Sequence, residues 1–263
     1  INLMIRRIKE ESEDLERKNA ELQVAAKIQE SFLPAIIELV PGYDIAAMSL
    51  PAKVVGGDFY DIIPGTRMRG DKEQVGIIIA DVSGKGLSAA IFMALSIVVI
   101  RVNAAWHKMP EDIFRDTNAI ITAEQKANMF VTAFFGVLDL AHQTFTYVNA
   151  GHNAPMVLHA NDDRIIELEP TGIALGLMED SLYEKATISL ASGDIIVLFT
   201  DGVTEATNMR EELYGEERLQ TIILANQGLP AGEIMKKILL DVQEFTGEAP
   251  QSDDITLLVV KVN

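Results

Sequence analysis

The chain contains no cysteine, and its basic residues are far outnumbered by acidic ones. The lack of cysteine excludes disulfide bonds, thiolate catalysis and zinc–thiolate sites, and it is compatible with a cytoplasmic location. The formal net charge is −17, so the chain lacks the basic surface that nucleic-acid binding requires. We therefore expect no nucleic-acid partner, although docking of a small basic partner stays open.

Targeting signals are also missing from the sequence. No signal peptide is recognisable, and no run of about 18 apolar residues is free of charge, so we expect no membrane span. The chain begins with Ile1 inside a helical pattern, which suggests a fragment of a longer protein that could be tethered to a membrane upstream. With 263 residues, 48% of them hydrophobic, the chain can form one large domain with an appendage.

The appendage is a charged helical segment that spans residues 1–34 and ends at Pro34. Apolar residues recur every seven positions, with a companion series four residues later. The first series is Ile1, Ile8, Leu15 and Leu22, and the second is Ile5, Ser12, Asn19, Ala26 and Leu33. This pattern favours a parallel coiled-coil homodimer with two polar positions in its seam. The alternative is a solvated helix that lies on the following domain.

The segment of residues 77–95 organises the following domain, residues 35–263. Three isoleucines predict a buried strand that ends near Asp81, and Gly84 and Gly86 permit a sharp turn before an apolar helix of about residues 87–106. An Asp in this position is often only a helix cap. The glycines and Lys85 do not have the spacing of a phosphate-binding P-loop, so we reject that motif.

The rest of the chain groups its strands together and its helices in pairs. We expect a helix at 109–127, an antiparallel strand pair at 130–140 and 144–151, and a strand at 154–160 that continues the same sheet. Two strands surround Ser192 and Gly193, two amphipathic helices follow at 216–227 and 231–245, and a last strand covers 253–262. This order favours an α+β fold with antiparallel sheets over a doubly wound one. Further strands are expected at 43–49 and 57–62, and a polar hairpin loop at 64–73.

Carboxylates recur at the ends of apolar strands that are distant in sequence. They are Asp58, Asp81, Asp201 and the pair Asp253 and Asp254. If the fold brings these ends together, the carboxylates repel one another, and hard divalent cations such as Mg²⁺ or Mn²⁺ would offset the charge. The alternative is that they are ordinary turn residues, which are common at strand ends.

Five motifs in this order resemble the PPM-type serine/threonine phosphatases, and most closely their bacterial SpoIIE/RsbU branch. They are VVGGDFYD, ADVSGKG, YVNAGHNAP, LFTDGVTEA and SDDITLL. The preceding AAKIQESFLP is similar to the linker helix of that branch. The resemblance covers about residues 20–262 and implies a β-sandwich of antiparallel sheets flanked by helices, with two metal ions, Mn²⁺ or Mg²⁺, at one edge.

The resemblance also implies roles for individual residues. Asp81 would bridge both metals, Asp58 and the backbone carbonyl of Val82 would complete one site, and Asp201 and Asp253 would hold the other. Asp254 is the less favoured member of its pair. A water activated by the two cations would attack phosphoserine or phosphothreonine.

Two basic residues near these motifs are further candidates. His152 is a candidate acid, for which a structural role is favoured. The wider family binds phosphate with an Arg near the first motif; this chain has no clear counterpart, although Lys53 lies close by in the sequence.

The branch typically acts under an upstream sensor on a phosphorylated anti-sigma-factor antagonist, and the resemblance implies both partners here. We further expect the orientation of the N-terminal helix to set metal affinity.

GGDFY is superficially similar to the diguanylate cyclase signature, but Phe59 stands where that family needs an acidic residue. A phosphatase-like binding domain without catalysis is the remaining alternative, and a metal-dependent phosphatase assay separates the two.

Overall fold

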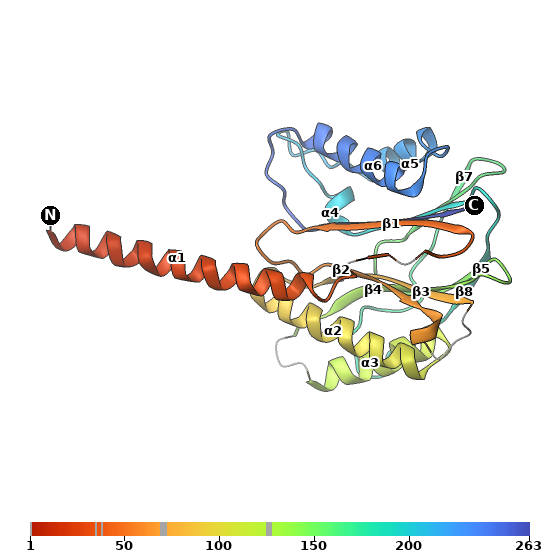
Figure 1. The fold of residues 1–263 in the computed structure, drawn as a ribbon, viewed down its shortest axis with the longest axis horizontal. Coiled ribbons are helices and arrows are strands. Elements are labelled where there is room, and N and C mark those ends of the chain that lie inside the picture. Colours follow the sequence, from red (N-terminus) through yellow and green to blue (C-terminus); the bar gives the residue numbers. More distant parts are fainter. Residues whose placement is uncertain (1, 35, 38, 69–72, 125–127) are drawn as a thin grey trace.

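The computed structural model describes residues 2–34, 36–37, 39–68, 73–124 and 128–263, and it forms a four-layer sandwich (Figure 1). Two five-stranded sheets pack face to face, and every strand pair within them is antiparallel. The first sheet has the order β1 (Tyr43–Leu50), β10 (Ile255–Val262), β9 (Ile195–Phe199), β6 (Met156–His159) and β7 (Arg164–Glu167). The second has the order β2 (Phe59–Pro64), β3 (Gln74–Val82), β4 (Val131–Asp139), β5 (Thr144–Ala150) and β8 (Ala186–Ser189).

Helices cover the outer face of each sheet (Figure 1). Helices α2 (Leu87–Trp106) and α3 (Pro110–Glu124) lie on the second sheet, and α5 (Glu216–Ala225) and α6 (Ala231–Thr246) lie on the first. Between β9 and α5, the short helix α4 (Asp201–Thr204) begins directly at one of the predicted ligands. The predicted α+β sandwich with flanking helices is therefore confirmed.

The central strand β3 shows why the sequence pattern is continuously apolar. Ile77, Ile78 and Ile79 are all fully buried. Ile77 and Ile79 point into the core between the two sheets, whereas Ile78 points into the core under α2 and α3. Because β3 is covered on both faces, it needs apolar side chains at every position and not at every second one.

One sequence expectation about the sheets needs correction. The strand at Met156–His159 does not continue the sheet of β4 and β5; it pairs with β9 and β7 in the other sheet. The two strands expected around Ser192 and Gly193 are present, and they divide between the sheets, since β8 pairs with β5 and β9 pairs with β10. Periodicity indicates that a strand is buried, but it does not indicate which partner the strand takes.

Helix α2 is long and apolar enough, by length and composition alone, to cross a membrane. The segment includes Arg101, so it does not contradict the expectation that no run of about 18 apolar residues is free of charge. Half of this segment is buried within the domain, where it packs against β2, β3 and α3. This packing assigns α2 to the core of the domain.

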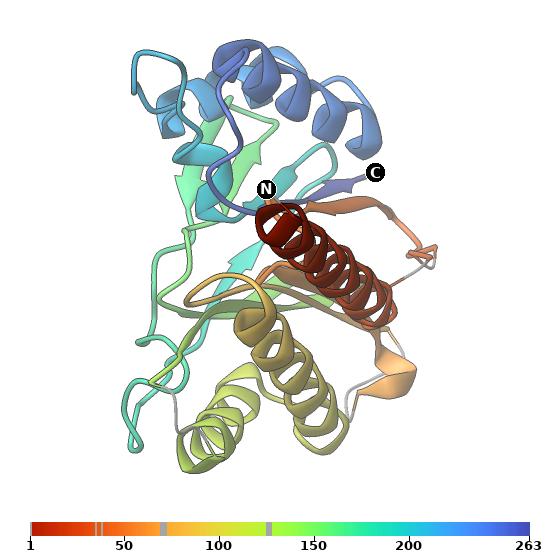
Figure 2. The same cartoon turned by 90° about the vertical axis from the view of Figure 1, so that its left-hand side faces the viewer.

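Helix α1 (Asn2–Glu30) projects from one end of the sandwich, and its C-terminal end passes beside α2 (Figures 1 and 2). Past its end, Phe32 and Leu33 pack against the core beneath α2, whereas Ile28 stays largely exposed. Ile1 and the side chains of Ile5 and Ile8 lie outside the described part of the structure. The predicted helix is confirmed, and its coiled-coil pairing stays a prediction.

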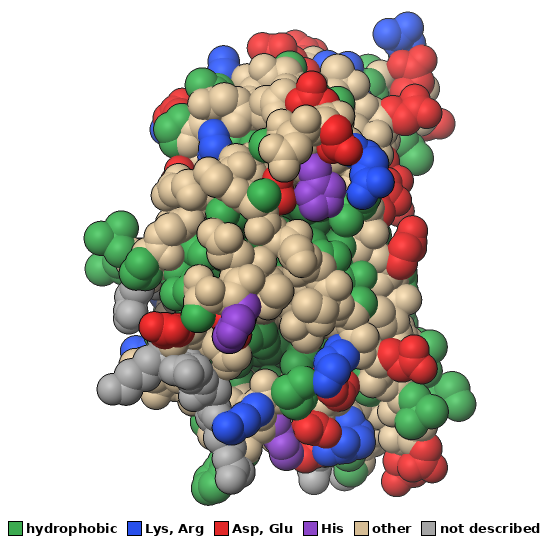
Figure 3. All heavy atoms as spheres, turned by 90° about the vertical axis from the view of Figure 1, so that its right-hand side faces the viewer, with side chains coloured by type: hydrophobic (Ala, Val, Ile, Leu, Met, Phe, Trp, Pro, Cys, Tyr) green, Lys and Arg blue, Asp and Glu red, His purple; other side chains and the backbone are tan. Residues whose placement is uncertain are grey.

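The opposite end of the sandwich looks away from α1 (Figure 3). Acidic, basic and apolar side chains are interspersed on its described surface, without a broad basic patch.

Candidate active site

The four predicted carboxylates meet at one edge of the sandwich, where the charges of Asp58, Asp201 and Asp253 all act on Asp81. The end of α1 lies at the same edge, because Gln29 and Asp58 line one small cavity. In an antiparallel pair, the start of one strand lies beside the end of its neighbour. Asp58 directly precedes β2, whose Phe59 pairs with Ala80 next to Asp81 on β3. In the other sheet, Asp201 follows β9 and Asp253 precedes β10, and these strands also pair antiparallel.

A hydroxyl group joins the two sheets at this edge. Thr200, at the end of β9, donates a hydrogen bond from Oγ1 to Oδ2 of Asp58 at 2.7 Å. The same Oγ1 accepts a hydrogen bond of 3.0 Å from the backbone N–H of Thr256. Because Asp58 is buried, with 5% of its surface exposed, this contact fixes its carboxylate against the opposite sheet.

The pKa values show that the carboxylates lie within one electrostatic field. Burial, and then the charge of Asp81, raise the pKa of Asp58 well above its usual range. Burial and the charge of Asp201 raise the pKa of Asp81 to about 7. Burial and the charge of Asp253 also raise the pKa of Asp201. The edge therefore carries acidic groups that resist ionisation without a cation.

One basic side chain reaches this cluster. Lys85, in the turn between β3 and α2, forms an ion pair of 2.7 Å from Nζ to Oδ2 of Asp253, and it donates a hydrogen bond of 2.9 Å to the carbonyl of Ser252. Among the described residues, no other Lys or Arg has an ion pair with the four predicted carboxylate ligands.

Asp254 has a different role from its neighbour Asp253. Its two carboxylate oxygens accept hydrogen bonds of 2.7 Å from the backbone N–H groups of Ala52 and Gly57, and the residue is buried. A Cβ at Gly56 would lie 2.2 Å from Oδ2 of Asp254, so only glycine allows this approach. Asp254 therefore anchors the first motif, in agreement with its being the less favoured ligand.

The carbonyl of Val82 lies beside the same loop. Val82 is buried at the end of β3, and a Cβ on Gly57 would lie 2.9 Å from its carbonyl oxygen. The glycine before Asp58 thus lets the first motif approach the predicted backbone ligand.

The donor set suits hard divalent cations. Carboxylates and a carbonyl are the oxygen ligands that Mg²⁺ and Mn²⁺ prefer. Within the described ranges, no three His, Cys, Asp or Glu side chains already converge as a cation cage. Burial and mutual repulsion raise the pKa values of Asp58, Asp81 and Asp201, and a divalent cation would stabilise their ionised forms.

His152 is placed as a structural residue. It is 2% exposed, and burial lowers its pKa to about 4, so it carries no proton to donate as an imidazolium at neutral pH. Its Nδ1 lies 3.1 Å from Oγ1 of Thr132, the residue that pairs with Asp81. Its backbone N–H donates to Oδ1 of Asn149 at 2.8 Å. Lys53 is exposed on the loop before Asp58.

The comparisons with known proteins agree with this arrangement. The family model described as Stage II sporulation protein E (SpoIIE) matches residues 71–263. The chain belongs to the SpoIIE family. The phosphoserine phosphatase RsbU of Bacillus subtilis (strain 168) is 32% identical over 251 residues, which cover 92% of this chain and 70% of RsbU. The phosphoserine phosphatase RsbP of the same organism is 28% identical, covering 92% of this chain and 58% of RsbP.

Solved structures share the fold of this SpoIIE-family chain. The SiaA-PP2C domain of Pseudomonas aeruginosa superposes with a TM-score of 0.82 at 22% identity, covering 95% of this chain and 99% of that one. RsbX, solved in complex with magnesium, superposes with a TM-score of 0.63 at 16% identity, covering 87% and 99%. Together with the relatives, these findings identify a PPM-type serine/threonine phosphatase of the SpoIIE/RsbU branch.

Three residues at the site were not anticipated from the sequence. Lys85 was considered only as part of a failed P-loop motif, Thr200 lies unremarked before Asp201, and Gln29 lies in the linker helix. Gln29 contacts the backbone of Gly56 with both ends of its amide. The AAKIQESFLP resemblance contained the signal for Gln29, whereas Thr200 could be recognised only after the sheets had been placed.

Proposed function

We propose that this chain is a metal-dependent protein phosphatase that hydrolyses phosphoserine or phosphothreonine on a regulatory protein. The observation that carries the proposal is the gathering of Asp58, Asp81, Asp201 and Asp253 at one edge, where burial and mutual repulsion raise the pKa values of the first three. Such a cluster is costly unless cations compensate it.

Each residue has a distinct task in this proposal. Asp81 would bridge two Mn²⁺ or Mg²⁺ ions, Asp58 and the carbonyl of Val82 would hold one of them, and Asp201 and Asp253 would hold the other. Two such cations supply a water of lowered pKa as nucleophile and polarise the phosphate oxygens. Thr200 keeps Asp58 oriented, and Asp254 keeps the first motif in place. No protein nucleophile is needed, in keeping with the absence of cysteine.

The substrate proposal rests on the relatives, two of which are phosphoserine phosphatases. We infer a phosphorylated anti-sigma-factor antagonist as the partner, in a cytoplasmic setting and under an upstream sensor in a longer protein. The test is hydrolysis of a phosphoserine protein of this type in Mn²⁺ and in EDTA, with phosphate release as the readout. Turnover that is equal in both conditions contradicts the metal mechanism, and no turnover with any phosphoprotein favours a binding domain without catalysis.

Two sets of contacts support regulation by the linker, one at the end of α1 and one at Phe32, just past that end. At the end of α1, Gln29 donates a hydrogen bond of 2.5 Å to the carbonyl of Gly56 and accepts one of 3.2 Å from the N–H of Gly56. Gly56 lies two residues before Asp58. A change in the position of α1 would therefore act directly on the backbone that carries this ligand.

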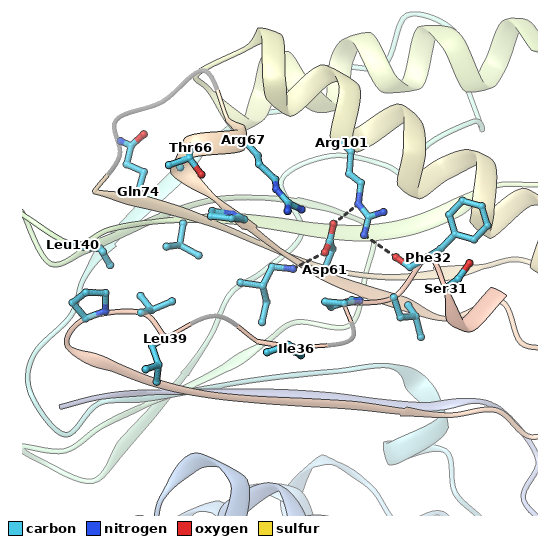
Figure 4. Close-up of a pocket in the computed structure, with 18 residues that line it drawn as sticks. Ser31, Phe32, Ile36, Leu39, Asp61, Thr66, Arg67, Gln74, Arg101 and Leu140 are labelled. Atoms are coloured by element: carbon cyan, nitrogen blue, oxygen red, sulfur yellow. Dashed lines mark hydrogen bonds and ion pairs between the residues drawn. The ribbon is translucent and has the colours of Figure 1, made fainter. Parts of the chain in front are cut away.

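The second contact involves α2 (Figure 4). Arg101 donates from Nη2 to the carbonyl of Phe32 at 2.7 Å and from Nε to Oδ2 of Asp61 at 2.6 Å. Asp61 lies on β2, three residues after Asp58, and is buried. These groups line a cavity of about 590 Å³ between the linker and β2. Arg101 thus ties the linker both to α2 and to β2, the strand that directly follows Asp58.

The linker proposal predicts a change in apparent metal affinity. Gln29→Ala removes both contacts with Gly56, and deletion of residues 1–33 or Phe32→Ala removes the packing. Activity measured against Mn²⁺ concentration should show a shifted half-saturation point. Glu21→Gln, an exposed change earlier on α1, is the control. Unchanged metal affinity and turnover in all three variants would show that the linker is only a tether.

The dimer proposal concerns the seam of α1. Leu15 is 60% exposed in the single chain, which leaves an apolar side chain for a second copy to cover. Leu15→Asp combined with Leu22→Asp would place charge in that seam and should produce monomers. Light scattering at high micromolar concentration measures the result. A monomeric unmodified chain would contradict the seam.

A further inference from the structure

Lys85 lies between two glycines on the turn that joins the metal-binding strand β3 to α2. Gly84 and Gly86 have φ values of +93° and +82°, and a Cβ at either position would meet no atom within 4 Å. The turn therefore uses a backbone conformation that glycine adopts readily, with open space around it. From this turn, Lys85 reaches across the edge to the loop before β10.

Lys85 contacts Asp253, one of the carboxylates proposed to bind a metal ion. Its Nζ lies 2.7 Å from Oδ2 of Asp253 and 2.9 Å from the carbonyl of Ser252. The side chains of Lys85 and Asp253 are 47% and 36% exposed, so the pair faces solvent and can open.

We propose that Lys85 is a built-in counter-ion that competes with the metal for Asp253, and that it thereby sets the metal concentration at which this half of the site fills. The proposal rests on the metal-dependent function proposed above. A divalent cation that binds Asp253 must displace the ammonium group, because two cations so close together repel each other. Lys85 is a positioning residue in this role, since it acts through Asp253.

The experiment measures metal binding directly, with free Mn²⁺ followed by electron paramagnetic resonance on the full chain. Lys85→Gln removes the competing charge and keeps much of the side-chain length. We expect the weaker Mn²⁺ site to bind about three- to tenfold more tightly, because an exposed ion pair and a nearby like charge have moderate effects. Lys85→Arg keeps the charge and should bind Mn²⁺ as the unmodified chain does.

A matched control separates this effect from a change in net charge. Lys236 on α6 forms an exposed ion pair of 2.8 Å with Glu233, so Lys236→Gln removes a comparable pair far from the cluster and should leave Mn²⁺ binding unchanged. In EDTA, Lys85→Gln should also lower the unfolding temperature by about 1–3 °C, because the carboxylates lose their cation. Circular dichroism confirms folding.

A double-mutant cycle tests whether Asp253 transmits the effect. In an Asp253→Asn background, Lys85→Gln should no longer tighten binding. Unchanged or weaker Mn²⁺ binding by Lys85→Gln, an equal effect of Lys236→Gln, or persistence of the effect without Asp253 would each overturn the proposal. A chain that binds no Mn²⁺ at all overturns the proposed metal-dependent function as well, whereas normal binding that Lys85 does not alter overturns only this inference.

Discussion

The two halves of the catalytic edge use the same residue type in different surroundings. Asp58 and Asp81 extend from the sheet of β2 and β3, where Asp58 is almost completely buried and receives a hydroxyl hydrogen bond from Thr200. Asp201 and Asp253 extend from the sheet of β9 and β10, where Asp253 is 36% exposed and paired with Lys85. The first half, called the dry half below, contains the buried Asp58 and lacks a basic partner among the described residues, although Asp81 is only partly buried. The second, called the wetter half, is partly neutralised by Lys85.

This difference shows what burial does to a carboxylate. In the dry half, burial is the largest cause of the raised pKa values of both Asp58 and Asp81, with repulsion second. In the wetter half, burial also raises the pKa of Asp201, but the charge of Asp253 is stabilised by water and by Lys85. We therefore expect the dry half to depend more strongly on bound metal than the wetter half.

The largest expected effect comes from Asp81, which the proposal assigns to both metals. Asp81→Asn should lower Mn²⁺-dependent turnover by about 10³-fold or more, since the metals stabilise the transition state by several kcal/mol. Asp253→Asn removes a ligand of only one ion and should cost less. Initial rates at saturating Mn²⁺ measure both variants.

Stability provides the control for this comparison. The folded-state pKa of Asp81 is raised to about 7, whereas the unfolded value is 3.8. Ionisation of Asp81 therefore lowers the free energy of unfolding as pH rises from 3.8 to about 7. Asp81→Asn should therefore be no less stable than the unmodified chain in EDTA at pH 8. Near-full turnover by folded Asp81→Asn, or a greater loss in Asp253→Asn, would contradict the assignment.

The next effect separates the adjacent residues Asp253 and Asp254. Asp254→Ala leaves the N–H groups of Ala52 and Gly57 without an acceptor, and it should lower the free energy of unfolding by about 3 kcal/mol. Asp253→Ala, whose side chain is partly exposed, should change it by less than about 1 kcal/mol. Urea unfolding in EDTA measures both. Equal losses would remove the distinction between anchor and ligand.

The smallest effect concerns His152, which is buried beside Thr132. Its folded-state pKa of about 4 lies below the unfolded value of 6.5, so the unfolded state binds the proton more tightly. Stability from this group is present above pH 6.5 and is lost as pH falls through 4. His152→Gln, measured in EDTA, should lack this part of the pH dependence. An identical pH profile for both proteins would contradict the assignment of His152 as buried and neutral.

Much of the fold was predictable because its patterns are local. The helix at Leu87–Trp106 and the last strand followed from apolar runs between turn residues, and the structure places both where they were expected. The strand at Met156–His159 was assigned to the wrong sheet, because its pairing with β9 depends on a residue segment about 40 positions away. Local patterns contain no information about such a choice.

The sequence by itself determined the carboxylates, their strand ends and their glycine neighbours, since ordered motifs and periodicity depend only on neighbouring residues. The tertiary structure decided what each carboxylate experiences. It paired Thr200 with Asp58 across two sheets, set Asp254 against Gly56 and Gly57, and carried Lys85 to Asp253. Burial and long-range charge set these environments, and both arise only when segments distant in the sequence come together.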